Sequence, residues 1–445
     1  MPRRNDTIAA IATAHGAAGV GIVRLSGPQA RSIAETISAL RLRPRRAQYA
    51  RFLGADRQVI DDGIAIYFAG PRSYTGEDVV ELQAHGSPVL LAQLLRRCIA
   101  LGARPARPGE FTERAFVEGK LDLAQAEAVA DLISAGSEAA ARAARRSLDG
   151  EFSRRLDTLT EQLTQLRMYI EAALDFPEED IDFLAAPELR ERLGQASETL
   201  VRLLRDAQHG KRLMDGLHAV IIGAPNVGKS SLLNALAADD RAIVSPIAGT
   251  TRDLLRENLS LDGVALTLVD TAGLRDSPDL IEAEGMRRAR AELARADVVL
   301  AMLDDHGTAA PQALAAEVSG AAVVLWLHNK CDLNDLPAHA VTREDGEHLW
   351  LSARTGAGLD ALRDRLRGLA GGEGGGSFSA RSRHLEALAL AQAHLAQAEG
   401  QLLAGNAELA AEELRQAQLG LGQITGQLDA DGLLGRIFSG FCIGK

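Results

Sequence analysis

Residues 223–230 read Gly-Ala-Pro-Asn-Val-Gly-Lys-Ser, which is the pattern G-x-x-x-x-G-K-S. The apolar run Ala219–Ile222 before it predicts a buried strand, and Ser231–Leu236 after it predicts the start of a helix. In this strand–loop–helix context a glycine-rich loop turns its backbone N–H groups toward phosphate oxygens. Lys229 is then expected to reach the β- and γ-phosphates, and the Ser230 hydroxyl to bind Mg²⁺.

Three further motifs follow in the order that a guanine-nucleotide domain requires. The apolar run Val264–Val269 ends in Asp270-Thr271-Ala272-Gly273, which offers a carboxylate to the metal shell and a glycine to the γ-phosphate. Val323–Leu327 leads into Asn329-Lys330-Cys331-Asp332, where an aspartate can accept both N–H donors of the guanine edge. Ser352-Ala353-Arg354 follows a further short strand, as a loop behind the base should. Because each motif follows a strand, we expect a Ras-like P-loop GTPase domain that binds GTP.

Length and composition limit the possible classes of protein. A chain of 445 residues is expected to form about three domains. No apolar run approaches the ~20 residues that span a bilayer, and the first residues lack a signal peptide, so we expect no membrane contact. Three scattered cysteines indicate a reducing, cytoplasmic setting. The net charge of −11 requires any RNA contact to be local, and the basic run Arg41–Arg46 is interpreted as a solvated loop.

Lysine is rare in this chain. The 49 basic residues include only Lys120, Lys211, Lys229, Lys330 and Lys445. A lysine that is retained in an arginine-biased chain is a candidate for a site that needs a compact ammonium group. Two of the five already lie in nucleotide motifs, which draws attention to Lys120 and Lys445.

Hydrophobic patterns divide the chain into domains. Residues 1–118 predict a small α+β domain, with strands at Ile8–Ala12, Val20–Leu25, Gly63–Phe68 and Val79–Gln83 and helices at Gln29–Leu40 and Ser87–Leu101. Residues 119–215 predict helices, one of which carries an apolar seam from Phe152 to Leu174. The nucleotide domain is expected at 216–370, and helices resume within 371–445. Because neither helical part can bury its apolar stripe alone, we expect them to form one discontinuous helical domain with the nucleotide domain inserted.

With these residues in place, the chain resembles the bacterial and organellar tRNA modification GTPase family known as MnmE or TrmE. The resemblance extends over essentially the whole chain, and Ala14-His15-Gly16 departs from the family's more common proline-containing turn. Outside the nucleotide motifs already described, it is carried by Asp6-Thr7-Ile8, Gly21–Gly27, Tyr74–Asp78, Glu81-Leu82-Gln83, Arg107–Thr112, Gly119–Leu123, Gly249–Asp253 and the terminal Cys442–Lys445.

The resemblance implies a homodimer whose N-terminal domain is similar to the folate-binding modules of one-carbon enzymes. It implies that Arg24, Glu81 and Lys120 hold a 5-formyl-tetrahydrofolate-type ligand, and that Lys445 reaches the same pocket. It further implies a heterotetramer-type complex with a FAD- and NADH-using partner, MnmG (formerly GidA). Together they would place an aminomethyl-type group on C5 of the wobble uridine of certain tRNAs. Cys442 is a candidate reactive thiol, with a buried packing cysteine as the alternative.

The sequence lacks the glutamine that orients the attacking water in Ras-like enzymes, so another group must take over this role in GTP hydrolysis. Leu274 stands where those enzymes place the glutamine that orients the attacking water. The resemblance implies K⁺ in the place of an arginine finger, and Glu282 orienting the water, although a solvated helix N-terminal acid would also explain Glu282. Lys229 and Glu282 are therefore the catalytic candidates of the nucleotide domain.

The residues expected to contact the nucleotide and its metal ions come from the four motifs and from the loop at 245–251. They are Asn226, Val227, Gly228, Lys229, Ser230, Ser231, Ser245, Pro246, Ile247, Ala248, Gly249, Thr250, Thr251, Asp270, Thr271, Ala272, Gly273, Asn329, Lys330, Asp332, Ser352, Ala353 and Arg354. The magnesium ligands among them are Ser230 and Thr251, and the potassium ligands are Asn226, Ser245, Ile247 and Thr250.

A function of a different class is a GTPase switch in ribosome assembly. Such proteins typically append a KH-type RNA-binding domain, and no G-x-x-G between helices in such a setting follows the nucleotide domain here. A deletion strain distinguishes the two functions. It would lose the wobble-uridine modification if the chain is a tRNA modification enzyme, and it would accumulate ribosomal precursors if the chain is a ribosome-assembly switch.

Overall fold

The structure is a computed structural model of the chain. It describes the residues numbered 6–175, 187–238, 256–261, 264–270, 292–304, 314–315, 318, 323–333, 336–369, 378–426, 431–442 and 444. The chain forms two compact units, one of residues 1–130, 147–192 and 393–445 and the other of residues 131–146 and 193–392.

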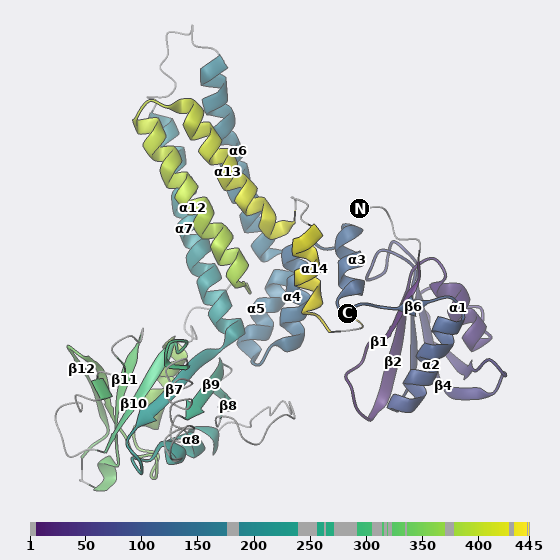
Figure 1. Ribbon diagram of the computed structural model, residues 1–445, viewed down its shortest axis with the longest axis horizontal. Coiled ribbons are helices and arrows are strands. Elements are labelled where there is room, and N and C mark those ends of the chain that lie inside the picture. Colours follow the sequence, from purple (N-terminus) through teal and green to yellow (C-terminus); the bar gives the residue numbers. More distant parts are fainter. Residues whose placement is uncertain are drawn as a thin grey trace, which may run out of the picture. The chain divides into compact units, whose positions relative to one another are not determined.

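The first unit begins with a sheet of strand order β3-β4-β5-β2-β1-β6 (Figure 1). Neighbouring strands are antiparallel except β1 and β6, which are parallel. The expected strands are present, whereas β3, in which glutamine and arginine interrupt the apolar residues, was not expected from the sequence. The strands are β1 (Ile8–Ile11), β2 (Ala18–Ser26), β3 (Gln48–Leu53), β4 (Val59–Phe68), β5 (Val79–Gly86) and β6 (Arg104–Pro105).

The two helices that the sequence predicted are present and pack on this sheet. They are α1 (Ala30–Ser38) and α2 (Pro88–Ala100). Their apolar stripes meet alternate residues of the strands, because successive side chains of a strand point to opposite faces. The resulting cluster contains Val23, Leu25, Phe52 and Leu82 from the sheet, Ile33 and Ile37 from α1, and Leu91 and Leu94 from α2.

A buried charge network fixes α3 (Glu110–Val117) against the sheet. The Glu110 side chain is fully buried and accepts hydrogen bonds from the Arg104 guanidinium and from the Arg107 backbone N–H. Burial acts to raise the pKa of Glu110, but these hydrogen bonds outweigh it, and the pKa falls to about 2. Arg114 donates to both Asp6 and Glu77 at 2.9 Å.

The same network brings together two polar strings that the sequence singled out. The Tyr74 hydroxyl lies 2.8 Å from the Thr112 hydroxyl, and Arg114 on α3 reaches Glu77 in the first string. Local turns and helix caps would have explained each string separately. The structure shows instead that residues 74–78 and 107–112 form one contact surface between the sheet and α3.

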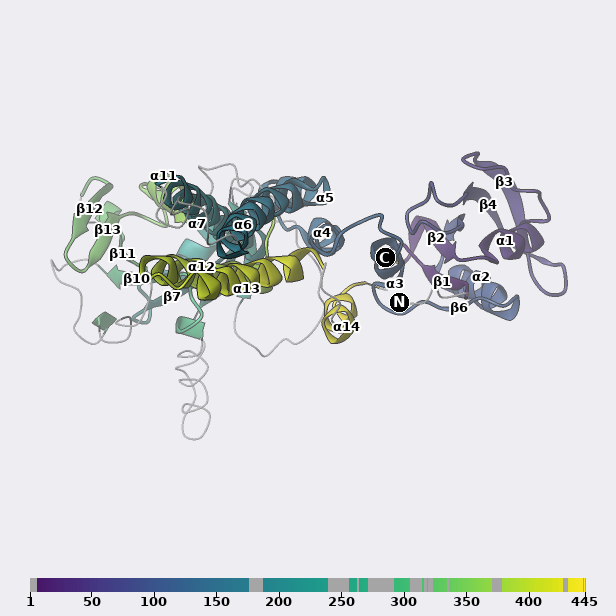
Figure 2. The ribbon, with the colours of Figure 1, turned by 90° about the horizontal axis from the view of Figure 1, so that it is seen from above.

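Long helices make up much of the remaining chain, and their seams are buried as predicted. α6 packs against α13, as Figures 1 and 2 show, and Gln418 joins them by accepting from Arg167 at 2.7 Å and donating to Thr164 at 2.6 Å. Helices from both sides of the nucleotide domain therefore pack together, which confirms the discontinuous helical domain. The helices are α4 (Leu123–Ser134), α5 (Glu138–Leu148), α6 (Glu151–Asp175), α7 (Pro187–Asp215), α12 (Ser382–Leu403), α13 (Ala407–Thr425) and α14 (Asp431–Ser439).

The nucleotide domain in the second unit is built on a seven-stranded sheet of order β12-β13-β11-β10-β7-β9-β8. The five inner strands are parallel, and each edge strand is antiparallel to its neighbour. The strands are β7 (Leu217–Gly223), β8 (Arg256–Leu261), β9 (Val264–Asp270), β10 (Val298–Asp304), β11 (Val324–Asn329), β12 (His339–Arg343) and β13 (Gly346–Trp350), and the helices include α8 (Lys229–Ala238), the short η2 (Cys331–Leu333) and α11 (Leu359–Leu369).

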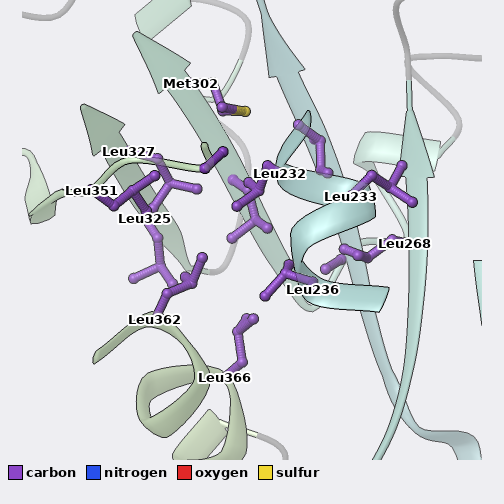
Figure 3. Packing of buried hydrophobic residues seen from close by; sticks show 14 of the residues in the cluster. Leu232, Leu233, Leu236, Leu268, Met302, Leu325, Leu327, Leu351, Leu362 and Leu366 are labelled. Carbon is purple, nitrogen blue, oxygen red and sulfur yellow. The ribbon is translucent and has the colours of Figure 1, made fainter. Parts of the chain in front are cut away.

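Both faces of this sheet are buried, which explains why its strands read as continuous apolar runs. On one face Leu325 and Leu327 pack with leucines of α8 and α11 (Figure 3). On the other face Val220, Ile222 and Trp326 belong to a second buried cluster. The core therefore holds β7 and β11 rigidly below the loops that carry the nucleotide motifs.

Across the part of the chain that the structure describes, no helix combines the length and the apolar character needed to cross a membrane.

Candidate nucleotide-binding site

The nucleotide motifs meet at one edge of the seven-stranded sheet. β7, β11 and β13 are parallel, so the loops that follow them share the carboxyl edge. The strand order also reverses at β7, with β9 on one side and β10 on the other, and such a switch point is where open α/β sheets bind ligands. A cavity of about 260 Å³ lies at this edge, lined by Asn226, Gly228, Ser231, Asn329, Lys330, Asp332, Leu333, Ser352, Ala353 and Arg354. The sequence analysis assigned all of these except Leu333, which directly follows Asp332.

The loop after β7 has the geometry of a phosphate cradle. Gly228 has a φ of +105°, and a Cβ at this position would lie 2.2 Å from the Asn329 side-chain nitrogen, so only glycine fits. Lys229, the first residue of α8, is buried and its ammonium group donates to the Gly223 and Ala224 carbonyls at 3.0 and 2.9 Å. The loop therefore curls around the lysine, and the N-terminus of α8 opens toward the same space.

Asn329 connects this loop to the loop behind the base. Its amide nitrogen donates to the Val227 carbonyl at 2.8 Å, and its amide oxygen accepts from the Ala353 backbone N–H at 3.0 Å. The side chain is 2% exposed, so both hydrogen bonds are shielded from water. A single asparagine thus fixes the spacing between the phosphate end and the base end of the cavity.

Asp332 presents an ionised acceptor at the base end of the cavity. The Ser352 hydroxyl, followed by the Arg354 guanidinium, lowers the pKa of the Asp332 carboxyl below its ordinary value. Arg354 Nη2 lies 2.6 Å from Asp332 Oδ2, and the Arg354 side chain is 75% exposed. Because an ion pair this exposed contributes little stability, the arginine can be displaced when the carboxylate binds a ligand.

Several assigned residues lie outside the described part of the chain. They are Ser245–Thr251, Thr271–Gly273, Leu274 and Glu282, and the side chain of Asp270 at the end of β9. Ser230, the assigned magnesium ligand, is exposed in the first turn of α8. Asn226, assigned to K⁺, is exposed with a φ of +62°.

A second cluster of assigned residues lies on the N-terminal sheet. Arg24 on β2 pairs with Glu81 on β5 at 2.8 Å, and its carbon Cζ lies 5.7 and 5.8 Å from the ring centroids of Tyr74 and Phe111. A further Arg24 nitrogen donates to the Gly444 carbonyl at 3.3 Å. The sequence analysis assigned Arg24 and Glu81, and the two rings between which the guanidinium lies were not assigned.

The two lysines assigned to the same ligand are placed differently. Lys120 is exposed, and its ammonium group donates to the Pro71 carbonyl at 3.2 Å, in the loop that leads to Tyr74. Lys445 lies outside the described residues, directly after Gly444.

The C-terminal tail docks on the N-terminal domain. Phe438 and Phe441 are buried in a cluster with Leu123 at the start of α4. The Cys442 carbonyl accepts from the Gly109 backbone N–H at 3.4 Å, while the cysteine itself is exposed. Gly444 has a φ of +96°, and a Cβ there would lie 2.5 Å from the backbone oxygen of Ile11 on β1. The described residues of the tail are therefore docked, and the Gly444 carbonyl lies beside Arg24.

Comparisons with known proteins agree with this arrangement. A family model described as the MnmE helical domain matches residues 123–442, and one described as the GTP-binding protein TrmE N-terminus matches residues 7–120. Among curated relatives, the tRNA modification GTPase MnmE of Xanthomonas campestris pv. campestris is 59% identical over 99% of this chain and 99% of that protein. The tRNA modification GTPase MnmE of Xylella fastidiosa is 56% identical over 100% of this chain and 99% of that protein.

Solved structures with a detectable likeness match shorter parts of the chain. The G domain of the T. maritima FeoB iron transporter is 22% identical over 35% of this chain and 98% of that chain, with a TM-score of 0.27. A variant of Aquifex aeolicus Era bound to GDP·AlF4⁻ is 26% identical over 40% of this chain and 66% of that chain, with a TM-score of 0.26.

The Asp332 carboxylate generates a prediction about base specificity. Replacing it in Asp332→Asn gives the residue an N–H donor opposite the donors of guanine, so we expect GTP affinity to fall roughly a hundredfold or more. Xanthosine triphosphate, which offers a carbonyl there, should bind better to the variant than to the wild type. Calorimetric titration of both nucleotides measures this, and Asp360→Asn on the exposed end of α11 is the control. Unchanged GTP affinity in Asp332→Asn would show that Asp332 does not read the base.

Proposed function

The chain belongs to the MnmE (TrmE) family of tRNA modification GTPases, and on this premise we propose the reaction that its residues serve. It is a GTP hydrolase that acts in tRNA modification. With a FAD- and NADH-using partner it adds an aminomethyl-type group to C5 of the wobble uridine of certain tRNAs. The observation that supports the GTPase activity most directly is Asn329, which joins the phosphate loop to the base loop around one cavity.

Different residues of the cavity would bind different parts of GTP. The backbone of residues 226–230 and the Lys229 ammonium group would hold the phosphates, and Asp332 would accept the N–H donors of guanine. Ser230 and Thr251 would bind Mg²⁺, which when bound neutralises charge on the phosphates. The cradle fits a phosphate chain because Gly228 lets the loop backbone pass close to the Asn329 amide and line the cavity, and because α8 begins at Lys229.

We propose that K⁺ replaces the arginine finger in this enzyme. Asn226 and the carbonyls of Ser245, Ile247 and Thr250 would hold the ion, and Glu282 would orient the attacking water. GTP turnover should then be at least about tenfold faster in K⁺ than in Na⁺ at equal ionic strength, because a group in that place stabilises transition-state charge. Asn226→Ala should abolish the difference, and Asn234→Ala on the exposed side of α8 serves as control.

Phosphate release in the two salts measures this dependence. If wild-type rates are equal in K⁺ and Na⁺, the ion is not part of the mechanism, and Arg252 or Arg275 becomes the candidate for the missing positive charge.

We propose that the Arg24–Glu81 pair forms part of a site for a 5-formyl-tetrahydrofolate-type ligand. The guanidinium suits the carboxylates of such a ligand and Glu81 suits the N–H donors of its pterin ring. Tyr74 and Phe111 add aromatic surface beside the pair, and the Gly444 carbonyl places the end of the tail next to it. Lys445, one residue further, could thus reach the ligand, and the domain that carries the site would mediate homodimer formation.

Lysine variants provide the test of this site. Charge-assisted hydrogen bonds contribute about 1.5–3 kcal/mol, so Lys120→Ala and Lys445→Ala should each weaken 5-formyl-tetrahydrofolate binding by roughly ten- to a hundredfold. Lys211→Ala, which removes a lysine that pairs with Asp215 on α7, is the matched control. Calorimetry measures the affinity and the GTPase rate reports folding. If Lys445→Ala binds like the wild type while Lys120→Ala does not, the tail is not part of the site.

The proposed reaction as a whole is tested by mass analysis of tRNA nucleosides from a strain that lacks this gene. We expect the modified wobble uridine to disappear and to return when the wild-type chain is supplied. Intact modification together with accumulated ribosomal precursors would favour the ribosome-assembly switch instead. The domain boundaries proposed for such experiments are 1–118, 119–215, 216–370 and 371–445. A cytoplasmic location is proposed from the three free cysteines.

A further inference from the structure

Five exposed arginines lie on two adjoining loops of the N-terminal domain, and we propose that this cationic surface binds the phosphodiester backbone of the RNA substrate. The proposal rests on the proposed function in tRNA modification and adds to it the surface by which the chain holds the nucleic acid. The arginine surface consists of Arg41, Arg43, Arg45 and Arg46, between α1 and β3, and Arg72, in the loop after β4.

The loop that carries four of these arginines is held firmly. Leu42 is buried, its backbone N–H donates to Glu35 at 2.9 Å, and its carbonyl accepts from Arg31 at 3.1 Å. Gln48 bridges the loop by accepting from the Arg43 backbone N–H at 2.7 Å and donating to the Arg41 carbonyl at 3.2 Å. The run is an exposed loop, as the sequence suggested, and these contacts fix its backbone.

Contacts to the sheet fix the middle of the loop. The Arg45 backbone N–H donates to the Tyr67 carbonyl on β4 at 2.7 Å, and Pro44 forms an isolated parallel β-bridge with Tyr67. Arg45 has a φ of +57°, a conformation that costs a non-glycine residue free energy and persists only where neighbours enforce it. Its side chain donates to the Arg72 carbonyl at 2.8 Å, which joins the second loop to the first.

The side chains of the five arginines are exposed. Among the described residues, none of the five arginines forms a hydrogen bond or an ion pair with a carboxylate. The acids beside the surface make their hydrogen bonds elsewhere, since Glu35 pairs with Arg31 at 2.9 Å and Asp78 accepts from the Gly70 backbone N–H at 2.9 Å. Arg41 adds only a longer-range charge interaction with Glu35. Other described arginines of this domain behave differently, as Arg24, Arg104 and Arg114 each bind a carboxylate.

The chemistry of the surface favours a phosphate backbone as its ligand. A guanidinium group matches two phosphate oxygens with parallel N–H donors, and arginines that are already spaced apart on a fixed loop lose little entropy on binding. Leu42, the large apolar residue of the run, points into the core, so the run offers no such side chain to a bilayer. In a chain with a net charge of −11, a local cationic surface also determines which face a polyanion approaches.

The test compares two fourfold variants with equal change in net charge. The first replaces Arg41, Arg43, Arg46 and Arg72 by glutamine and keeps Arg45, whose side chain holds the two loops together. The control replaces four other exposed arginines of the same unit by glutamine, namely Arg57, Arg96, Arg154 and Arg415. Binding of unmodified tRNA to the full-length chain is measured by fluorescence anisotropy from 50 to 200 mM salt, with GTPase rate as folding control.

We expect the first variant to lose roughly ten- to a hundredfold in tRNA affinity at the low-salt end. The slope of log affinity against log salt concentration should fall by about 0.7–0.9 for each arginine that contacts a phosphate. In the control variant, both the tRNA affinity and the salt slope should change much less. Equal losses in the two variants, or no tRNA binding by the wild type, would overturn the proposal. The proposal would also be overturned if polyglutamate or anionic vesicles bound the wild-type chain as tightly as tRNA does and lost as much affinity in the first variant.

A complementation experiment separates this proposal from the proposed function. If the wild-type gene restores the modified nucleoside and the first variant restores it equally at low expression, the arginine surface has no role and the function stands. If the wild-type gene itself restores nothing, the proposed function fails, whatever the tRNA affinity of the variants.

Discussion

The nucleotide cavity depends on the paired hydrogen bonds of Asn329. One side chain satisfies the Val227 carbonyl in the phosphate loop and the Ala353 N–H in the base loop, and it does so out of contact with water. Neither loop could keep this spacing alone, because exposed loops exchange their hydrogen bonds with solvent. The constraint also explains why Gly228 must lack a side chain, since any Cβ there would occupy the position of the Asn329 amide. One buried side chain therefore couples the geometry of the two loops that line the cavity.

Arginine serves two purposes in the N-terminal domain, and its surroundings decide which. Arg104 and Arg114 lie among Asp6, Glu77 and Glu110, where they hold α3 on the sheet. Among the described residues, the five arginines of the arginine surface form no ion pair or hydrogen bond with a carboxylate, and their side chains are exposed to solvent. A chain that uses arginine for most of its positive charges thus obtains both structural ties and a cationic surface from one residue type, according to where carboxylates are placed.

The long-range contacts of the C-terminal tail unify the first unit. Phe438 and Phe441 bury their rings near the start of α4, and Gly444 lies against β1 with its carbonyl on Arg24. The final residues thereby become part of the N-terminal domain, although the helical domain and the nucleotide domain separate them in sequence. Any ligand held by Arg24 and Glu81 would bind next to the end of the chain, so tail and ligand site are expected to order one another.

The sequence by itself determined the features that depend on local patterns. The loop at 223–230, the motif at Asn329–Asp332 and the seam of α6 could be predicted, because their spacing and their alternation of apolar residues lie within short windows. The sequence did not predict β3, whose arginine and glutamine conceal the strand pattern. That the tail reaches the pocket of Arg24 and Glu81 was expected only from the family resemblance, because no local pattern in the tail indicates where it docks. Only the tertiary structure decided which arginines are neutralised, because carboxylates far away in sequence, such as Asp6 and Glu77 for Arg114, supply the partners. Electrostatic pairing and backbone contacts of this kind act through space, and no local pattern records them.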